Sequence, residues 1–181
     1  SDRLRITAQL INVIDGYHLW SERYDRELKE IFDVQDEISL AIVDVLKVKL
    51  QESEKEKLLK RYTDHIEAYN LCQQAFYSFN QIDINLFDKV VALLNEALKI
   101  DPNYTPAYFG LGNAYFGMAF FGIKRTSEVI TDIRKCVYKI LEIDENFCEG
   151  YDLLGILLAT IEWKKPEALT AWQRSVELNP N

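Results

Sequence analysis

The sequence predicts a mainly α-helical fold in which about three stacked helical hairpins follow a β-hairpin and one helix. A tyrosine recurs at the same phase of three segments that lie about 40 residues apart, a spacing typical of helical repeats. Each segment closes with a similar tripeptide. The tyrosines are Tyr69, Tyr108 and Tyr151, and the tripeptides begin at Ile100, Ile143 and Leu178. A stacked array of this kind favours a binding surface over a catalytic pocket.

Residues 4–25 predict the β-hairpin, because apolar and polar residues alternate with the period of a half-buried strand. The apolar residues of the first strand are Leu4, Ile6, Ala8 and Leu10. A three-residue loop over 14–16, with Gly16 in the left-handed region, would pair Leu10 with Trp20. It would also pair Ile6 with Tyr24, whereas a two-residue loop would shift this register. We favour the three-residue loop because it places the large apolar groups on one face.

A helix is expected after the hairpin, with Asp33 as its N-cap. An apolar stripe at helical spacing predicts that this helix covers the hairpin. The residues at this spacing are Ile38, Ala41, Ile42, Val45, Leu46, Val48 and Lys49. The charged segment 51–62 then predicts a solvated helical connector. We therefore expect the hairpin and its helix in 1–50, the connector in 51–62 and the helical array in 63–181.

The array is expected to consist of three repeats with boundaries at 63–104, 105–146 and 147–181. Asp64 and Glu67 fit a capping box at the start of the first helix. The second helix of the first repeat is expected over 87–100, because Pro102 disfavours helical geometry in the residue before it. Pro106 then falls in the first turn of the following helix, where its missing N–H costs nothing.

Composition excludes several classes of function. The chain has 21 basic and 29 acidic residues and a net charge of −8. Nucleic-acid binding relies on clustered basic side chains, so no nucleic-acid partner is expected. No apolar run is long enough to span a bilayer, and the start lacks a signal-peptide core, so no membrane insertion is expected.

The three cysteines have no metal-ligand spacing. They predict buried thiols in a reducing compartment, with no metal site and no cofactor. We therefore expect a cytoplasmic protein. A periplasmic location would require a membrane anchor upstream in a parent protein.

The repeated segments resemble the tetratricopeptide repeat, whose first helix carries a large residue, then leucine and glycine, then an aromatic. The matching residues are Tyr108, Leu111, Gly112 and Tyr115 in the second repeat, and Tyr151, Leu154, Gly155 and Leu158 in the third. The family's small residues and closing proline match Ala97 and Pro102 in the first repeat, and Ala168, Ser175 and Pro180 in the third. The resemblance implies an α-α superhelix that binds proteins.

The chain also departs from this pattern. Gln73 replaces the first glycine, and Ile133 and Ile140 replace the small residues of the second repeat. The extra residues of the second repeat predict a longer turn between its two helices.

The N-terminal part is similar to the end of a TolB-like domain. The similarity rests on the stretches 5–11, 15–25 and 32–38, supported by 67–69 and 99–104. Such domains precede tetratricopeptide arrays in bacterial adenylate cyclases and winged-helix transcriptional regulators. The resemblance implies that the hairpin and helix are the C-terminal remnant of a truncated α/β domain. It also implies that the chain is the regulatory C-terminal part of a bacterial signalling protein, with any catalytic or DNA-binding part upstream.

The tetratricopeptide resemblance further implies a concave groove that binds a protein or peptide partner. The residues at groove-facing positions are Asn70, Gln74, Tyr77, Phe109, Asn113, Phe116, Asp152 and Ile156. Amides and aromatic rings suit an extended peptide or a partner helix. Lysine and arginine are scarce at these positions, which argues against a clamp for acidic peptide C-termini.

No catalytic motif is present, so we expect a non-enzymatic scaffold module. The alternative is a small-ligand sensor or enzyme with a pocket between the hairpin and the first repeat. Trp20, Tyr24 and Tyr62 would line that pocket. The open edge of the hairpin sheet is a template for another strand. It predicts homodimerisation through the hairpin or a contact with domains absent from the chain.

Overall fold

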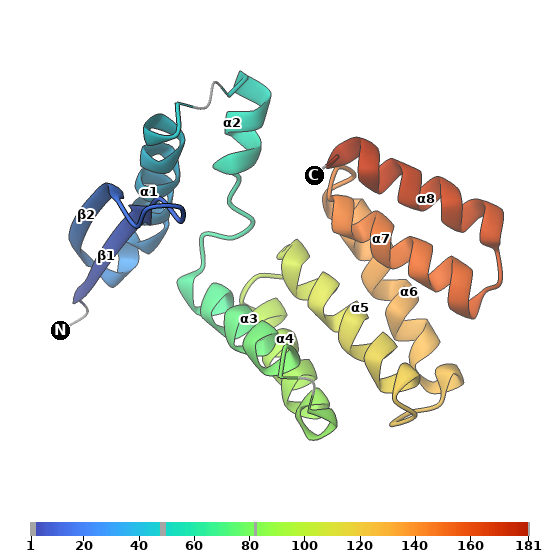
Figure 1. Cartoon of the computed structure of the whole chain (residues 1–181). Helices are drawn as coiled ribbons and strands as arrows, with labels where there is room; N and C mark the ends of the chain where they lie inside the picture. The colour runs from blue at the N-terminus through green and yellow to red at the C-terminus, as the bar shows by residue number, and fades with distance from the viewer. Residues whose placement is uncertain (1–2, 48–49, 82, 181) are drawn as a thin grey trace. The chain divides into compact units, whose positions relative to one another are not determined.

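The structure, a computed structural model, describes residues 3–47, 50–81 and 83–180. Within these residues a two-stranded antiparallel hairpin is followed by eight α-helices (Figure 1). The predicted mainly helical fold class is therefore confirmed. The chain divides into two compact units, the N-terminal unit Ser1–Arg61 and the C-terminal unit Tyr62–Asn181. In the described part of the chain, no helix combines the length and the apolar character needed to cross a membrane.

The hairpin consists of β1 (Arg3–Ile11) and β2 (His18–Glu27). Leu10 pairs with Trp20 and Ile6 with Tyr24, so the predicted register is confirmed. The predicted three-residue loop is wrong. Asn12 donates to the carbonyl of Tyr17 over 2.9 Å, which leaves a loop over 13–16. A bulge after Leu10 absorbs the extra residue, while Gly16 adopts the expected left-handed backbone with φ +72°.

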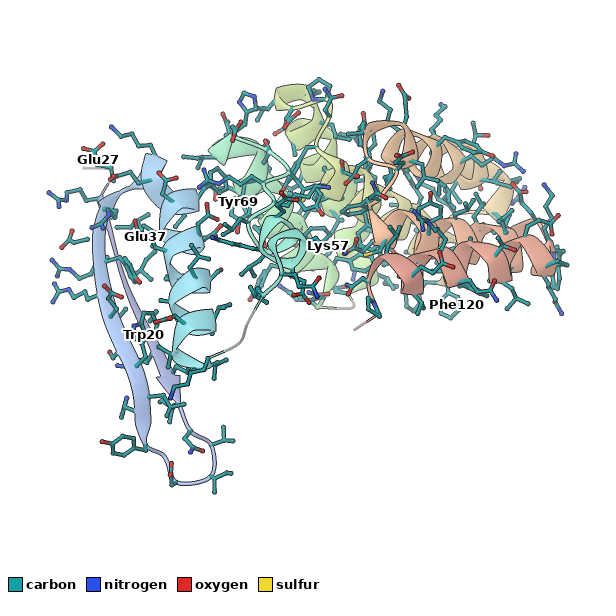
Figure 2. The ribbon with its side chains drawn as sticks, turned by 90° about the horizontal axis from the view of Figure 1, so that it is seen from above. Trp20, Glu27, Glu37, Lys57, Tyr69 and Phe120 are labelled. Carbon is teal, nitrogen blue, oxygen red and sulfur yellow. The ribbon has the colours of Figure 1, made fainter. Side chains whose placement is uncertain are left out.

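Helix α1 (Ile31–Val45) packs against β2 and covers one face of the hairpin. Trp20 and Glu37 both lie between the hairpin and α1, and Glu37 pairs with Arg26 over 3.6 Å (Figure 2). Tyr24, together with Phe32 and Val34 of the first helical turn, forms the buried part of this contact.

The start of α1 differs from the expectation. Asp33 is not the N-cap, because a 3-10 turn over Leu28–Glu30 places the start of the helix at Ile31. Asp33 lies in the first turn, where a negative charge still suits the helix dipole. Val48 and Lys49 of the predicted stripe lie outside the described residues.

The connector contains a short helix, α2 (Glu52–Leu58), which is opened by a capping box between Gln51 and Glu54. Arg61, near the C-terminal end of the connector, binds side chains of α1. The guanidinium of Arg61 donates to the carboxylates of Asp33, over 2.8 Å, and Asp36. It also lies over the ring of Phe32, 5.8 Å from the ring centre. These contacts tie the last residue of the N-terminal unit to the first turns of α1.

The C-terminal unit is a series of helical hairpins (Figure 1). The pairs are α3 (Ile66–Phe79) with α4 (Phe87–Ile100), α5 (Thr105–Phe120) with α6 (Thr126–Ile143), and α7 (Cys148–Ile156) with α8 (Lys165–Leu178). A 3-10 turn (Ile84–Leu86) precedes α4, and a π-helical turn (Leu157–Ile161) continues α7. Helix α5 also contacts α3, α4 and α7, so successive hairpins are packed together.

The structure confirms two predicted helix boundaries in this unit and corrects one. Helix α4 spans 87–100 and Pro106 lies in the first turn of α5, as expected. The predicted capping box at Asp64 is wrong: His65 is the N-cap of α3, and its N–H donates to the hydroxyl of Thr63 over 3.1 Å.

The second repeat does not have the longer turn that we expected. Its turn covers 121–125, whereas the helices of the first repeat are separated by 80–86. The extra residues lengthen the helices instead: α5 and α6 have 16 and 18 residues, against 14 each for α3 and α4.

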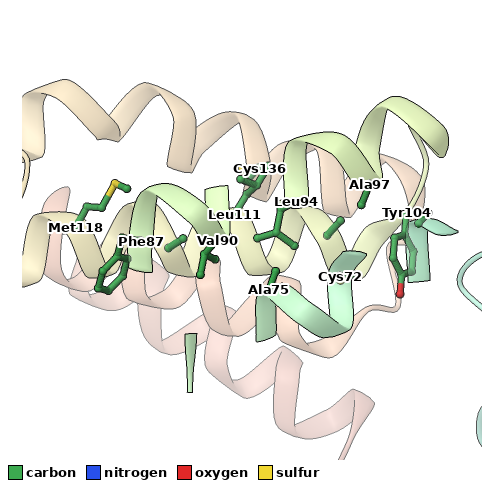
Figure 3. Packing of buried hydrophobic residues seen from close by; sticks show 13 residues of the cluster. Cys72, Ala75, Phe87, Val90, Leu94, Ala97, Tyr104, Leu111, Met118 and Cys136 are labelled. Atoms are coloured by element: carbon green, nitrogen blue, oxygen red, sulfur yellow. The ribbon is translucent and has the colours of Figure 1, made fainter. Parts of the chain in front are cut away.

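Two hydrophobic cores fill the C-terminal unit. The first joins α3, α4 and α5 around Leu94 and Met118 (Figure 3). The second joins α5, α6 and α7 around Ile133, Ile140 and Leu153. The two bulky isoleucines that replace small residues are thus fully buried between helices.

Two glycines at the same phase of their repeats permit close helix packing. The space next to Gly112 is filled by Leu153, which is fully buried. The indole of Trp172 fills the space next to Gly155, so close that an added Cβ would lie 2.3 Å from its Nε1. The corresponding residue of the first repeat, Gln73, is exposed and needs no such space.

We predict that Gly155→Ala lowers the free energy of unfolding by about 1–3 kcal/mol, because the added methyl group overlaps a rigid indole. Chemical denaturation of the two proteins measures the difference. Gly110→Ala is the matched comparison and should lower the stability less, since its nearest atom would lie at 3.0 Å rather than 2.3 Å. Equal stability of Gly155→Ala and the wild type would contradict this account of the α7–α8 packing.

The carboxylate of Glu162 lies between two cations at the end of the π-helical turn. Arg134 Nε donates to it over 2.7 Å, and Lys164 Nζ lies 2.9 Å from its other oxygen. The hydrogen bonds from Lys164 and then Arg134 lower the pKa of Glu162. Its side chain is 10% exposed. The contact therefore links α6 to the loop before α8.

A lowered folded-state pKa means that this stabilisation is present above the unfolded-state pKa of Glu162 and is lost as the pH falls through the folded value. We predict that Glu162→Gln lowers the free energy of unfolding by about 1 kcal/mol at pH 7. The difference from the wild type should shrink as both are measured towards pH 3. A difference that does not change with pH would contradict an ionic role for this side chain.

Candidate binding site

A pocket of about 200 Å³ opens among α3, α4 and α5. The end of α3 and one face of α5 supply most of its walls, and α4 supplies buried side chains. The lining residues are Phe76, Phe79, Asn80, Val90, Leu94, Phe109, Gly110 and Asn113. Val90 and Leu94 are almost completely buried. The pocket is thus a small apolar hollow with two amide side chains.

Two of the predicted groove residues, Phe109 and Asn113, line this pocket. Both are half-buried and stand one helical turn apart on α5. The Nδ2 of Asn113 donates to the carbonyl of Phe109 over 2.9 Å. The amide oxygen of Asn113 is therefore the atom with which it can accept a hydrogen bond from a ligand.

The other predicted groove residues do not line the pocket. Asn70, Gln74 and Tyr77 are exposed on α3, and 72% of Tyr77 is accessible. Phe116 is half-buried and stacks on Phe120, with ring centres 6.3 Å apart. On α7, Asp152 is exposed and Ile156 is half-buried. The pocket thus brings together only the α5 pair.

Three pocket residues of α3 and its end were not predicted: Phe76, Phe79 and Asn80. Phe76 and Phe79 lie in the last turn of α3, where their spacing is that of ordinary core residues, and Asn80 is the C-cap of this helix. The one sequence signal for this part of the pocket was the amide of Asn80 at a helix end. That signal does not point to binding, because asparagine is common at such ends for conformational reasons alone.

Phe109 also has a structural contact outside the pocket. Its ring meets the edge of Phe147, with ring centres 6.1 Å apart, and Phe147 in turn meets Tyr62 at 5.4 Å. Phe147 is buried. Burial, and then the charges of Glu149 and Asp144, raise the pKa of Tyr62 to about 12. The aromatic row therefore stabilises the turn before α7 as well as one wall of the pocket.

The residues of the alternative small-ligand site have defined surroundings within their own units. Tyr24 is buried, and its hydroxyl donates to the carboxylate of Glu22 over 3.0 Å. Burial and then this carboxylate raise the pKa of Tyr24. Trp20 is half-buried in the hairpin. The hydroxyl of Tyr24 thus already serves the internal structure of the N-terminal unit.

The hairpin carries a group of exposed apolar side chains at its tip. Val13 and Ile14 in the loop are 96% and 91% exposed, and Tyr17 is 72% exposed. Ile11 and Leu19 extend this group along the two strands. Homodimerisation through the hairpin, or its contact with another domain, stays a prediction.

Comparison with known proteins finds similarity to a bacterial protein. No protein-family model matches the chain. A protein of Rhizobium meliloti (strain 1021) that bears the name "Putative adenylate cyclase 3" is 40% identical over 114 residues. The match covers 61% of this chain and 19% of the relative, so the chain spans about a fifth of the relative's length. Over this stretch the chain is similar to part of a protein named for signalling chemistry.

We predict that Phe109→Ala and Asn113→Ala affect stability differently. Phe109→Ala should lower the free energy of unfolding by about 2 kcal/mol, because the ring packs on Phe147. Asn113→Ala should stay within about 0.5 kcal/mol of the wild type, since the better helix propensity of alanine offsets the lost hydrogen bond. Thermal and chemical unfolding measure both values. Equal effects of the two substitutions would contradict the dual role of Phe109.

Proposed function

We propose that this chain is a non-catalytic interaction module of a signalling protein, and that it binds a protein or peptide partner through the pocket among α3, α4 and α5. The observation that carries the proposal is the chemistry of the pocket. Its eight lining residues are apolar except for Asn80 and Asn113, and none of the eight has an ionisable side chain. Hydrophobic walls and amides are groups that bind rather than groups that transfer protons.

The size of the pocket favours a peptide over a metabolite. Pockets for drug-sized ligands enclose roughly 300–1,000 Å³. The pocket of this chain encloses about 200 Å³, which suits one side chain of a larger partner. This argues against the alternative of a small-ligand sensor at this site.

The order of the elements supports the same proposal. A hairpin and helix followed by packed helical hairpins is the order that the TolB-like and tetratricopeptide resemblances imply. The similarity to a protein named as an adenylate cyclase supports a place in a signalling protein of that type. We propose that the chain acts there as a regulatory scaffold segment, with any catalytic part elsewhere in the parent protein.

The proposal can be tested with random peptides displayed on phage and panned on the full chain. Selected peptides should bind the wild type, and Asn113→Arg should weaken them about tenfold or more, because it places a guanidinium at an uncharged pocket. Fluorescence polarisation of the labelled peptides measures the affinities. The absence of any enriched peptide, or equal binding by Asn113→Arg, would overturn the proposal.

Asn95→Arg is the matched control for this substitution. Asn95 also donates its Nδ2 to the carbonyl four residues earlier, over 2.8 Å to Val91. It lies on α4 and does not line the pocket. The control should therefore bind the selected peptides as the wild type does.

A further inference from the structure

We infer that the pocket among α3, α4 and α5 is an anchor site for a single aromatic side chain of the partner. This inference rests on the proposed function and names the group that the pocket would recognise. Four features of the pocket carry it: its volume, its walls, its missing charge and the glycine in its lining.

The volume corresponds to one ring. An apolar protein cavity of about 150 Å³ holds benzene, so a pocket of slightly greater volume accepts a phenyl group with its methylene. The pocket has about 200 Å³. A single buried ring is also the kind of contact that dominates many protein interfaces, because it removes a large apolar area from water at the loss of few rotatable bonds.

The walls favour a ring over a branched aliphatic chain. Phe76, Phe79 and Phe109 surround the space, and Val90 and Leu94 lie among its buried residues. Aromatic rings attract each other edge-to-face beyond the effect of buried area alone. Phe79 and Phe109 already make such edge contacts with Phe87 and Phe147. An inserted ring would add to an existing aromatic network.

The lining excludes charged anchors. None of the eight residues carries a charge that could neutralise a carboxylate, an ammonium or a guanidinium, and burying an ion without a counter-charge is costly. The amides of Asn80 and Asn113 can instead bond to the partner's backbone, because an amide both donates and accepts. The pocket chemistry therefore selects a neutral ring on a polar backbone.

Gly110 is part of the pocket lining, and two other lining side chains, Leu94 and Phe76, pack directly against it. A Cβ at this position would lie 3.0 Å from Leu94 Cδ1 and 3.2 Å from Phe76 Cε1. These distances are tight but not prohibitive for folding. A methyl group on Gly110 would thus displace these two lining side chains and reduce the fit of a ring in the pocket, while the helices stay packed.

The test uses two-dimensional NMR of the full chain with N-acetyl-phenylalanine N-methylamide as the probe. Signals of the pocket residues should shift saturably with this probe. The leucine analogue should bind more weakly, and the aspartate and lysine analogues should not shift these signals. Gly110→Ala should weaken the phenylalanine probe about tenfold or more, the usual effect of one carbon in an apolar pocket. Asn95→Ala, outside the pocket, should bind it normally.

Val90→Ile provides a second pocket-filling variant should Gly110→Ala not fold, and it should weaken the same probe. No shift with the phenylalanine probe would overturn the inference, and so would equal or tighter binding of the leucine probe. Unchanged affinity in a folded pocket-filling variant would also overturn it. If panned peptides still bind and still respond to Asn113→Arg in these cases, the proposed function stands without the aromatic anchor. If neither probe nor peptides bind, both fail.

Discussion

The packing of α5 is the constraint on which the rest of the C-terminal unit depends. This helix takes part in both hydrophobic cores, with Leu111 and Met118 in the first and Phe109 and Phe116 packed against the second. A helix that is apolar on nearly all sides is stable only when neighbours cover it. The α3–α4 hairpin, the partner helix α6 and helix α7 supply that cover, so neither core is complete without this one helix.

Small residues make the double packing possible. Gly110, Gly112, Ala114 and Gly117 are all buried in α5, and side chains from α3, α4, α6 and α7 fill the space next to the three glycines. Leu94 lies against Gly110, Leu153 against Gly112, and Phe87 against Gly117. The candidate pocket is a consequence of this arrangement. It lies beside Gly110, where the neighbours approach less closely than at Gly112 or Gly117.

Local patterns in the sequence predicted those features that depend on a few neighbouring residues. The strand register follows from the alternation of apolar residues, and the limits of α4 follow from its apolar period and from Pro102. The N-caps at Asp33 and Asp64 were predicted wrongly because several acceptors stand close together. The side chains that accept backbone N–H groups just before these helices are instead those of Glu30 and Thr63.

The candidate site was predicted only in part, for a related reason. The repeat phase identified Phe109 and Asn113 on one face of α5, because that face is a property of one helix. Phe76, Phe79 and Asn80 belong to the pocket because of the distance between α3 and α5. That distance is set by the side chains around Gly110, which no pattern within α3 records. For a site between two helices, the sequence therefore predicts only the residues that share a face of one helix, here Phe109 and Asn113 on α5.

The charge of the chain and the chemistry of the pocket act on different steps of the proposed binding. A net charge of −8 attracts partners with basic segments and raises their rate of encounter, and salt screens this attraction. The pocket has no charge for salt to screen. It contributes the burial of the partner's ring, and dissociation of the partner exposes that apolar surface to water again. That contribution appears mainly in the dissociation rate. Basic flanks would thus bring a partner to the surface, and the anchor would decide which partner stays.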